Sequence, residues 1–188
     1  QKGKISVRKT GDIFTSVTTA SSAYTNENGE MIVNPTTYTP VFADGDLSGT
    51  VFQVIAVEDI VTLDGTVHAN AGDVVAEITT DENGYAETDL LYLSKYEIKE
   101  VQAPYGYVRN SESQFVELTY AGQEIAVRDT VNASFVNDYQ SVEISLSKVM
   151  ENDELFGIGN NNEYLSVRFG LFAAEDIQAA DGTVIPAD

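Results

Sequence analysis

Apolar and polar residues alternate in short runs along most of the first 140 residues. The clearest runs are 4–9, 49–56 and 74–79, and similar ones cover 96–100, 114–119 and 133–137. Alternation places every second side chain on one face, which is typical of half-buried antiparallel strands. Asn83-Gly84 adds a hairpin-turn signal, and helical periodicity is scarce. The pattern therefore predicts an all-β, immunoglobulin-like antiparallel sandwich of about seven short strands.

A weak internal repeat divides the chain. Residues 54–67 (VIAVEDIVTLDGTV) and 171–184 (LFAAEDIQAADGTV) are identical at eight of fourteen positions, and Phe52 matches Phe169 just upstream. The strand at 4–9 recurs at 143–148. Repeats of this kind indicate serial modules. We expect one complete module over 1–140 and the N-terminal part of a second, truncated one over 141–188.

The first copy carries extra sequence between Lys9 and Phe52. This interval is 22 residues longer than the matching interval from Lys148 to Phe169, and it is rich in Thr, Ser, Tyr and Asn. An Asn-Gly turn at 28–29 predicts an inserted hairpin around 11–48, and the prolines at 35 and 40 favour an edge or a loop. Two interpretations stay open: the excursion contacts a ligand, or it covers a sheet edge.

Composition narrows the possible partners. Ten basic and thirty acidic residues give a formal charge of −20, which repels nucleic acid and anionic lipid. No apolar run is long enough to span a membrane, and the absence of cysteine excludes disulfides and thiolate metal sites. We therefore expect no nucleic-acid partner, no membrane partner, no cofactor and no metal.

Three motifs together resemble a known family. A first strand ends at Lys9, the centre carries the segment Glu100-Val101-Gln102-Ala103-Pro104-Tyr105-Gly106-Tyr107, and a last strand ends at Asn137. Residues 1–140 thereby resemble the Cna-B, or SpaA-type, isopeptide-forming domains of Gram-positive surface adhesins and pilins. The resemblance implies the prealbumin-like form of the sandwich and a location at the cell surface, attached to the cell wall.

The resemblance also implies a role for each of the three residues. Lys9 is the nucleophile, Asn137 the electrophile, and Glu100 the catalytic acid and base of an amide bond between side chains. The chemistry agrees, because burial in an apolar core lowers the pKa of a lysine and releases a neutral amine. The amine attacks the Asn137 side-chain carbonyl while a protonated Glu100 hydrogen-bonds the carbonyl oxygen and relays protons, and ammonia leaves. Lys4 and Asp138 are poorer candidates, since alternation turns them to the opposite faces of their strands.

Lys148 matches Lys9 in the second copy and is the candidate nucleophile there. No second copy of the Glu100 segment or of the Asn137 strand follows within the sequence, and 48 residues are too few for a stable core. We expect residues 141–188 to be held by the first module or to self-associate through an unpaired sheet edge.

These observations favour a structural stalk module of a secreted surface protein, whose partners are neighbouring modules of the same protein. The alternative is an adhesin domain that presents the 11–48 excursion to a host protein or glycan. An enzyme is not expected, since the crosslink forms once per molecule. The lone His68 lies beside a turn-like sequence, and the repeated pairs Glu58-Asp59 and Glu175-Asp176 are better explained by a shared turn than by a cation site.

Overall fold

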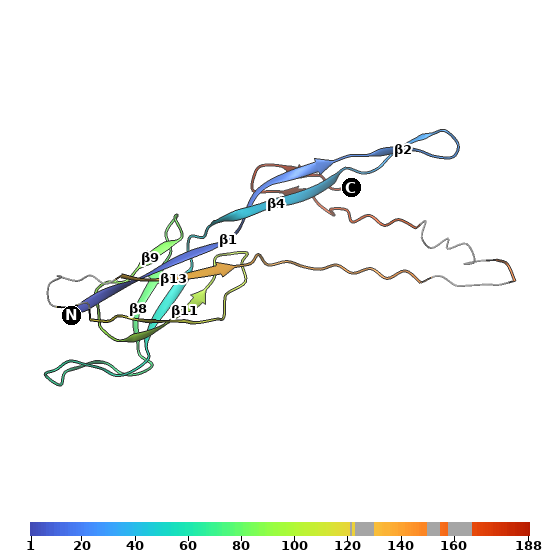
Figure 1. Ribbon diagram of the computed structural model, residues 1–188. Coiled ribbons are helices and arrows are strands. Elements are labelled where there is room, and N and C mark those ends of the chain that lie inside the picture. Colours follow the sequence, from blue (N-terminus) through green and yellow to red (C-terminus); the bar gives the residue numbers. More distant parts are fainter. Residues whose placement is uncertain (121, 123–129, 150–154, 158–166) are drawn as a thin grey trace. The chain divides into compact units, whose positions relative to one another are not determined.

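The computed structural model describes residues 1–120, 122, 130–149, 155–157 and 167–188 (Figure 1). Within these residues the secondary structure is entirely β, and no helix is long and apolar enough to cross a membrane. The strands are β1 (Lys2–Ala20), β2 (Ala23–Thr25), β3 (Met31–Val33), β4 (Thr37–Asp46), β5 (Val51–Ala56), β6 (Ile60–Val61), β7 (Val67–Ala69), β8 (Val74–Thr79), β9 (Tyr85–Glu87), β10 (Leu91–Tyr92), β11 (Lys95–Gln102), β12 (Gln114–Glu117), β13 (Thr130–Asn137), β14 (Ile177–Gln178) and β15 (Val184–Ile185).

Contacts divide the chain into two units, which are described separately. The first comprises Gln1–Thr15 and Phe42–Gln140, and the second comprises Ser16–Val41 and Ser141–Asp188. The division of the sequence into a module over 1–140 and a truncated one over 141–188 stays a prediction.

Two larger sheets and a two-stranded sheet of β6 and β7 build the described part of the first unit. One larger sheet has the order β10-β1-β13, with β4 and β9 also paired to β1, and the other has the order β12-β11-β5-β8. The all-β prediction is thus confirmed, and most neighbours are antiparallel as expected. The exception is the pair β1 and β13, which run parallel from Lys4 opposite Thr130 to Gly11 opposite Asn137. The first and last strands of the unit therefore lie side by side.

The core lies between the inward faces of these sheets. Alternate residues of each central strand are buried, as the sequence pattern predicts. The largest of them are Ile5 and Val7 of β1, Phe52 and Val54 of β5, Tyr96 and Ile98 of β11, and Phe135 of β13. The rings of Phe52 and Phe135 pack with centroids 4.8 Å apart, which joins the two sheets.

In the second unit, the extra sequence of the first copy forms a two-stranded hairpin. The ends of β1 and β4 lead into a short ladder of β2 and β3, and the chain turns between Asn26 and Glu30. Gly29 has φ of +82°, a conformation that glycine adopts without a side-chain clash. Pro40 lies within β4, whose described pairing is to β1 alone, so its missing N–H interrupts no second ladder.

Candidate crosslinking site

Three strands each place one polar side chain inside the core of the first unit. Lys9 follows Ile5 and Val7 on the inward face of β1. Glu100 follows Tyr96 and Ile98 on β11, and Asn137 follows Ala133 and Phe135 on β13. The two-residue period of a strand thus carries each polar group inward with its apolar neighbours. The exposed fractions of Lys9, Glu100 and Asn137 are 0%, 0% and 3%.

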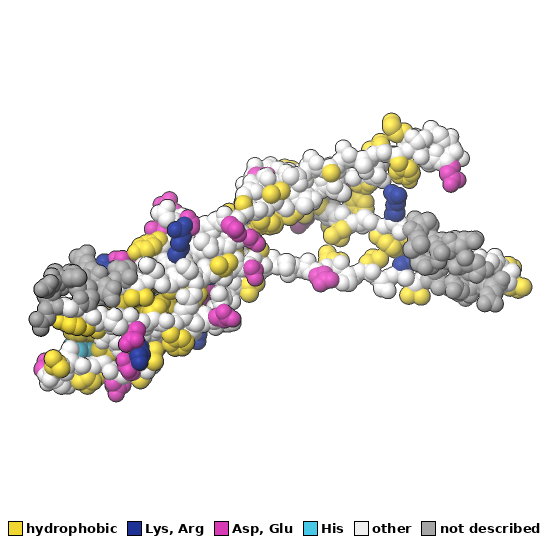
Figure 2. Space-filling model, viewed as in Figure 1, with side chains coloured by type: hydrophobic (Ala, Val, Ile, Leu, Met, Phe, Trp, Pro, Cys, Tyr) yellow, Lys and Arg dark blue, Asp and Glu magenta, His cyan; other side chains and the backbone are white. Residues whose placement is uncertain are grey.

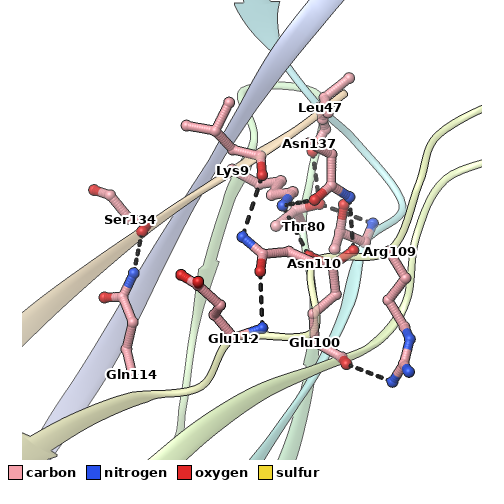
Figure 3. Close-up of polar contacts among 12 residues, drawn as sticks. Lys9, Leu47, Thr80, Glu100, Arg109, Asn110, Glu112, Gln114, Ser134 and Asn137 are labelled. Atoms are coloured by element: carbon pink, nitrogen blue, oxygen red, sulfur yellow. Dashed lines mark hydrogen bonds and ion pairs between the residues drawn. The ribbon is translucent and has the colours of Figure 1, made fainter. Parts of the chain in front are cut away.

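The three side chains form a closed set of hydrogen bonds. Lys9 Nζ donates to Glu100 Oε2 at 2.8 Å and to Asn137 Oδ1 at 2.5 Å. Asn137 Nδ2 donates to Glu100 Oε1 at 2.6 Å. Figure 3 shows the three side chains converging from their separate strands. Residues 128 positions apart in the sequence, Lys9 and Asn137, are thereby in direct contact.

The surroundings of the Lys9 amine are apolar apart from these partners. Nζ lies 5.7 Å from the ring centroid of Phe135 and 6.0 Å from that of Phe52. Burial lowers the pKa of Lys9 below its ordinary value of 10.5, and the hydrogen bond and charge of Glu100 act in the opposite direction. The environment therefore increases the neutral, nucleophilic fraction of the amine.

Backbone contacts fix the position of Lys9 itself. Its N–H donates to the carbonyl of Gly84 at 2.7 Å, and its carbonyl accepts the N–H of Leu47 at 3.0 Å. Gly84 belongs to the Asp81–Gly84 turn predicted from the sequence and has φ of +65°. Thr80 hydrogen-bonds the carbonyl of Leu47 at 2.7 Å, which ties the segments on both sides of Lys9 together.

Residues 106–108, at the end of the central motif, hydrogen-bond and pack against the chain just beyond Asn137. Val108 N–H donates to the carbonyl of Asp138, and Gln140 N–H donates to the carbonyl of Gly106, both at 2.9 Å. The rings of Tyr107 and Tyr139 pack at 4.4 Å between centroids. These contacts give the segment after Glu100 a structural purpose, since they hold β13 where Asn137 meets its partners.

Tyr107 also reaches back to the first strand. Its hydroxyl donates to the backbone carbonyl of Asp12 at 2.8 Å. Burial, followed by the neighbouring Tyr139, raises the pKa of Tyr107, so the hydroxyl stays protonated and able to donate. Sequence analysis did not anticipate this link, although Tyr107 belongs to the motif and could have drawn attention.

The geometry allows one carboxyl group to move protons between the amine and the amide. Glu100 Oε2 faces the lysine nitrogen, and Oε1 faces the asparagine nitrogen. A proton taken from the amine on one oxygen can thus be returned to the departing nitrogen from the other. The sequence-based mechanism instead has Glu100 contacting the Asn137 carbonyl oxygen. Here that oxygen faces Lys9, so proton relay is the role that this arrangement suits.

The other residues considered from the sequence lie outside this cluster. Lys4 pairs with Glu87 on the opposite face of β1, and Asp138 is exposed. Lys148 is exposed, and no described contact joins it to a glutamate or an asparagine. His68 is exposed and stacks on Tyr92 with ring centroids 3.9 Å apart.

The repeated acidic pair has a backbone role in both copies. Asp59 accepts the N–H of Ala71 at 2.8 Å, and Asp176 accepts the N–H of Ala187 at 2.8 Å. Each carboxylate closes a loop of similar length, which agrees with a shared turn. In the part of the chain that the structure describes, no group of three or more His, Cys, Asp or Glu residues could hold a metal ion.

Several solved structures of pilins are similar to this chain. A variant of BcpA, the major pilin subunit of Bacillus cereus, is 18% identical with a TM-score of 0.41, and the match covers 74% of this chain and 30% of that one. GBS52, the minor pilin of Streptococcus agalactiae, is 16% identical with a TM-score of 0.44, over 78% and 48% of the two chains. The major pilin SpaD of Corynebacterium diphtheriae is 19% identical with a TM-score of 0.43, over 74% and 30%. The chain thus spans less than half the length of these proteins.

Sequence-family comparison is more specific. The comparison with curated proteins finds no match. The family described as SpaA, prealbumin-like fold domain, matches residues 42–132, which include β5, β8 and β11 and the Glu100 motif. This assignment agrees with the all-β architecture described above. Residues 42–132 therefore match a SpaA-type domain with the prealbumin-like fold.

Proposed function

We propose that this domain is a structural stalk module of a Gram-positive surface protein of the pilin class, stabilised by an amide bond between Lys9 and Asn137. The observation that carries the proposal is the buried contact of Lys9 Nζ with both Glu100 and Asn137. Burial of polar and charged side chains costs free energy unless they hydrogen-bond, pair or react with one another. A buried lysine, asparagine and glutamate in mutual contact therefore point to a reaction or to mutual stabilisation. The SpaA-type family of the domain adds support.

The reaction balances without any further reagent. The neutral Lys9 amine attacks Cγ of Asn137, and the new C–N bond forms as Glu100 accepts a proton from the nitrogen. Glu100 returns that proton to the asparagine nitrogen, the old C–N bond breaks, and one ammonia leaves. The groups are already in contact, and such placement can supply about 7–11 kcal/mol of the barrier reduction. The bond forms once, so the domain is not an enzyme with turnover.

The proposal is tested by the intact mass of the purified protein. Wild type should be one ammonia lighter than its sequence requires. Glu100→Gln, which keeps the size of the side chain but removes the proton relay, and Lys9→Met, which removes the nucleophile, should both have the full mass. Lys4→Met is the matched control: Lys4 lies on the same strand and faces the other way, so its variant should still lose ammonia.

A peptide digest identifies the bond directly. Wild type should yield one branched peptide that contains both residue 9 and residue 137. A wild-type protein of full mass, or a branched peptide involving another lysine, would refute the proposed bond. Circular dichroism of Glu100→Gln checks that the variant is folded, so that a full mass reports the missing proton relay and not an unfolded protein.

The adhesin alternative has less support. It requires Tyr24 and Tyr38 of the hairpin to form a free concave surface. Instead, Tyr38 lines a cavity together with Leu171 and Phe172, and the guanidinium carbon of Arg168 lies 5.3 Å from the ring centroid of Tyr24. Both rings are engaged with the chain's own C-terminal residues.

A further inference from the structure

The hairpin arm, residues 16–41, packs against the C-terminal segment, residues 167–188. Both belong to the second unit, although more than 120 positions separate them in the sequence. Figure 1 shows β14 and β15 (red) beside the ends of β1 and β4 in the arm. The contacts between the two segments are both polar and apolar.

The polar contact is made by the turn between β14 and β15. Asp181 Oδ2 accepts the backbone N–H of Val17 at 2.8 Å, while Oδ1 accepts the N–H of Thr183 at 2.9 Å. One carboxylate thus closes its own turn and binds the arm. Both bonds, that of Thr183 first, lower the pKa of Asp181 and keep it charged. A charged acceptor strengthens such hydrogen bonds.

Apolar side chains of both segments also line one cavity. Pro35 and Tyr38 of the arm line a cavity of about 360 Å³ with Phe169, Leu171 and Phe172 of the C-terminal segment. Apolar side chains (yellow) gather where these two segments meet in Figure 2. The Arg168 guanidinium over the Tyr24 ring adds a cation–π contact near the tip of the arm.

The contact with the arm distinguishes the second copy of the repeat from the first. Asp64, the counterpart of Asp181, closes the same turn through Oδ1, which accepts from Thr62 and Thr66, with no described contact to the arm. Phe52 and Val54 are fully buried in their sheet, whereas their counterparts Phe169 and Leu171 are 58% and 81% exposed. Among the described residues, the C-terminal segment contacts the arm through Asp181 and Arg168.

We propose that the hairpin arm is a docking site for part of the following repeat. The occupant is residues 167–188 of the same chain, and the contact ties one repeat to the next. The arm occurs in the first copy but not between Lys148 and Phe169 of the second, so it is a dedicated addition and not a part of the repeated scaffold. The proposal goes beyond the crosslink and does not depend on it.

Hydrogen exchange of the full chain, measured by NMR, tests the polar contact. The Val17 amide should be protected in wild type, and Asp181→Asn should speed its exchange by about tenfold or more, because the amide group keeps one acceptor oxygen for two donors. Thr183 should stay protected, since asparagine also closes such turns. Asp64→Asn is the matched control and should leave Val17 unchanged.

Nuclear Overhauser contacts between the Tyr38 ring and the Leu171 methyl groups test the apolar contact. They should be present in wild type at a concentration where diffusion shows a monomer, and should weaken in Asp181→Asn. A Val17 amide that exchanges freely in wild type, or the absence of these contacts, would overturn the proposal. So would contacts that occur only in a dimer, because the occupant would then be a second copy. The intact mass of each variant reports on the crosslink separately, so failure of either proposal can be told from failure of the other.

Discussion

Lys9 is a completely buried lysine, and its hydrogen-bonding partners determine the free-energy cost of burying its charge. Burial favours the neutral amine, whereas the hydrogen bond and the charge of Glu100 favour the ammonium. A lysine that retained its charge here would need the carboxylate to offset several kcal/mol of lost hydration. Formation of an amide removes the titratable group altogether, so the crosslinked core contains no lysine charge.

Glu100→Gln should make the free energy of unfolding depend on pH, because burial then acts on the pKa of Lys9 without the opposing charge of Glu100. The variant keeps Lys9 as a free amine, removes the charge of Glu100 and weakens the hydrogen bond to Lys9, so the folded-state pKa lies below the unfolded value near 10.5. Between these two values the unfolded state binds more protons than the folded state. The free energy of unfolding should therefore rise with pH, by at most about 1.4 kcal/mol per pH unit.

Urea denaturation between pH 7 and pH 10 measures this effect. The double variant Lys9→Met and Glu100→Gln is the control and should lack the rise, because no buried amine remains to titrate. A single variant whose stability falls across this range, or matches the double variant, would contradict the assigned pKa direction.

At the scale of elements, the close approach of β1 and β13 brings the cluster together. The two strands run parallel and end with Gly11 opposite Asn137. A Cβ atom on Gly11 would clash with the backbone oxygen of Asn137 and lie 2.7 Å from Leu47 Cδ1. Only glycine lets the last strand come this near, so this residue controls the distance between the reacting side chains.

Gly11→Ala should therefore weaken both the fold and the crosslink. The added methyl group must displace β13, which we expect to cost about 1–3 kcal/mol and to leave part of the protein at full mass. Urea denaturation and intact mass measure the two effects. Gly29→Ala is the control for backbone strain: its φ of +82° strains an alanine, but a Cβ there meets nothing within 4 Å and the residue lies in the exposed turn of the arm, so this variant should lose some stability and keep the complete crosslink. Complete crosslinking of Gly11→Ala at wild-type stability would show that the close approach is dispensable.

The sequence predicts those elements whose apolar residues alternate. The expected strand 74–79 coincides with β8, and the runs at 4–9 and 96–100 lie within β1 and β11. The same alternation is consistent with Lys9 and Glu100 on the inward faces of their strands, whereas their roles come from the resemblance of their motifs to the family. The continuation of β1 to Ala20 was not anticipated, because its Thr- and Ser-rich end lacks an apolar face. The parallel pairing of β1 with β13 could not be predicted from local sequence either, because strand pairing depends on residues far apart in the chain.

At the scale of the whole molecule, the proposed bond would join the first strand of the module to the last. It would close a loop between two residues that lie 128 positions apart in the sequence. By comparison with disulfides around loops of similar length, the lost entropy of the unfolded chain corresponds to about 4–5 kcal/mol of added stability. Strands β1 and β13 are also hydrogen-bonded neighbours, so the bond reinforces an existing contact without a change of topology.

The mechanical effect should be larger than the thermodynamic one. In a chain pulled from attachments at residues 1 and 140, force enters β1 and leaves through β13. An amide between Lys9 and Asn137 carries this force directly, so the strands between them are never loaded. Without the bond, the sheets must resist by hydrogen bonds alone, and the chain between Lys9 and Asn137, which are 128 positions apart, unfolds and extends. Glu100→Gln should then extend by about 400 Å more than wild type, since an extended chain spans roughly 3.3–3.6 Å per residue.

Single-molecule force spectroscopy measures this difference in extension, with Lys4→Met as the control that should remain as short as wild type. Equal extension of wild type and Glu100→Gln would mean that no covalent bond carries the load, and the domain would then owe its strength to the sheets alone.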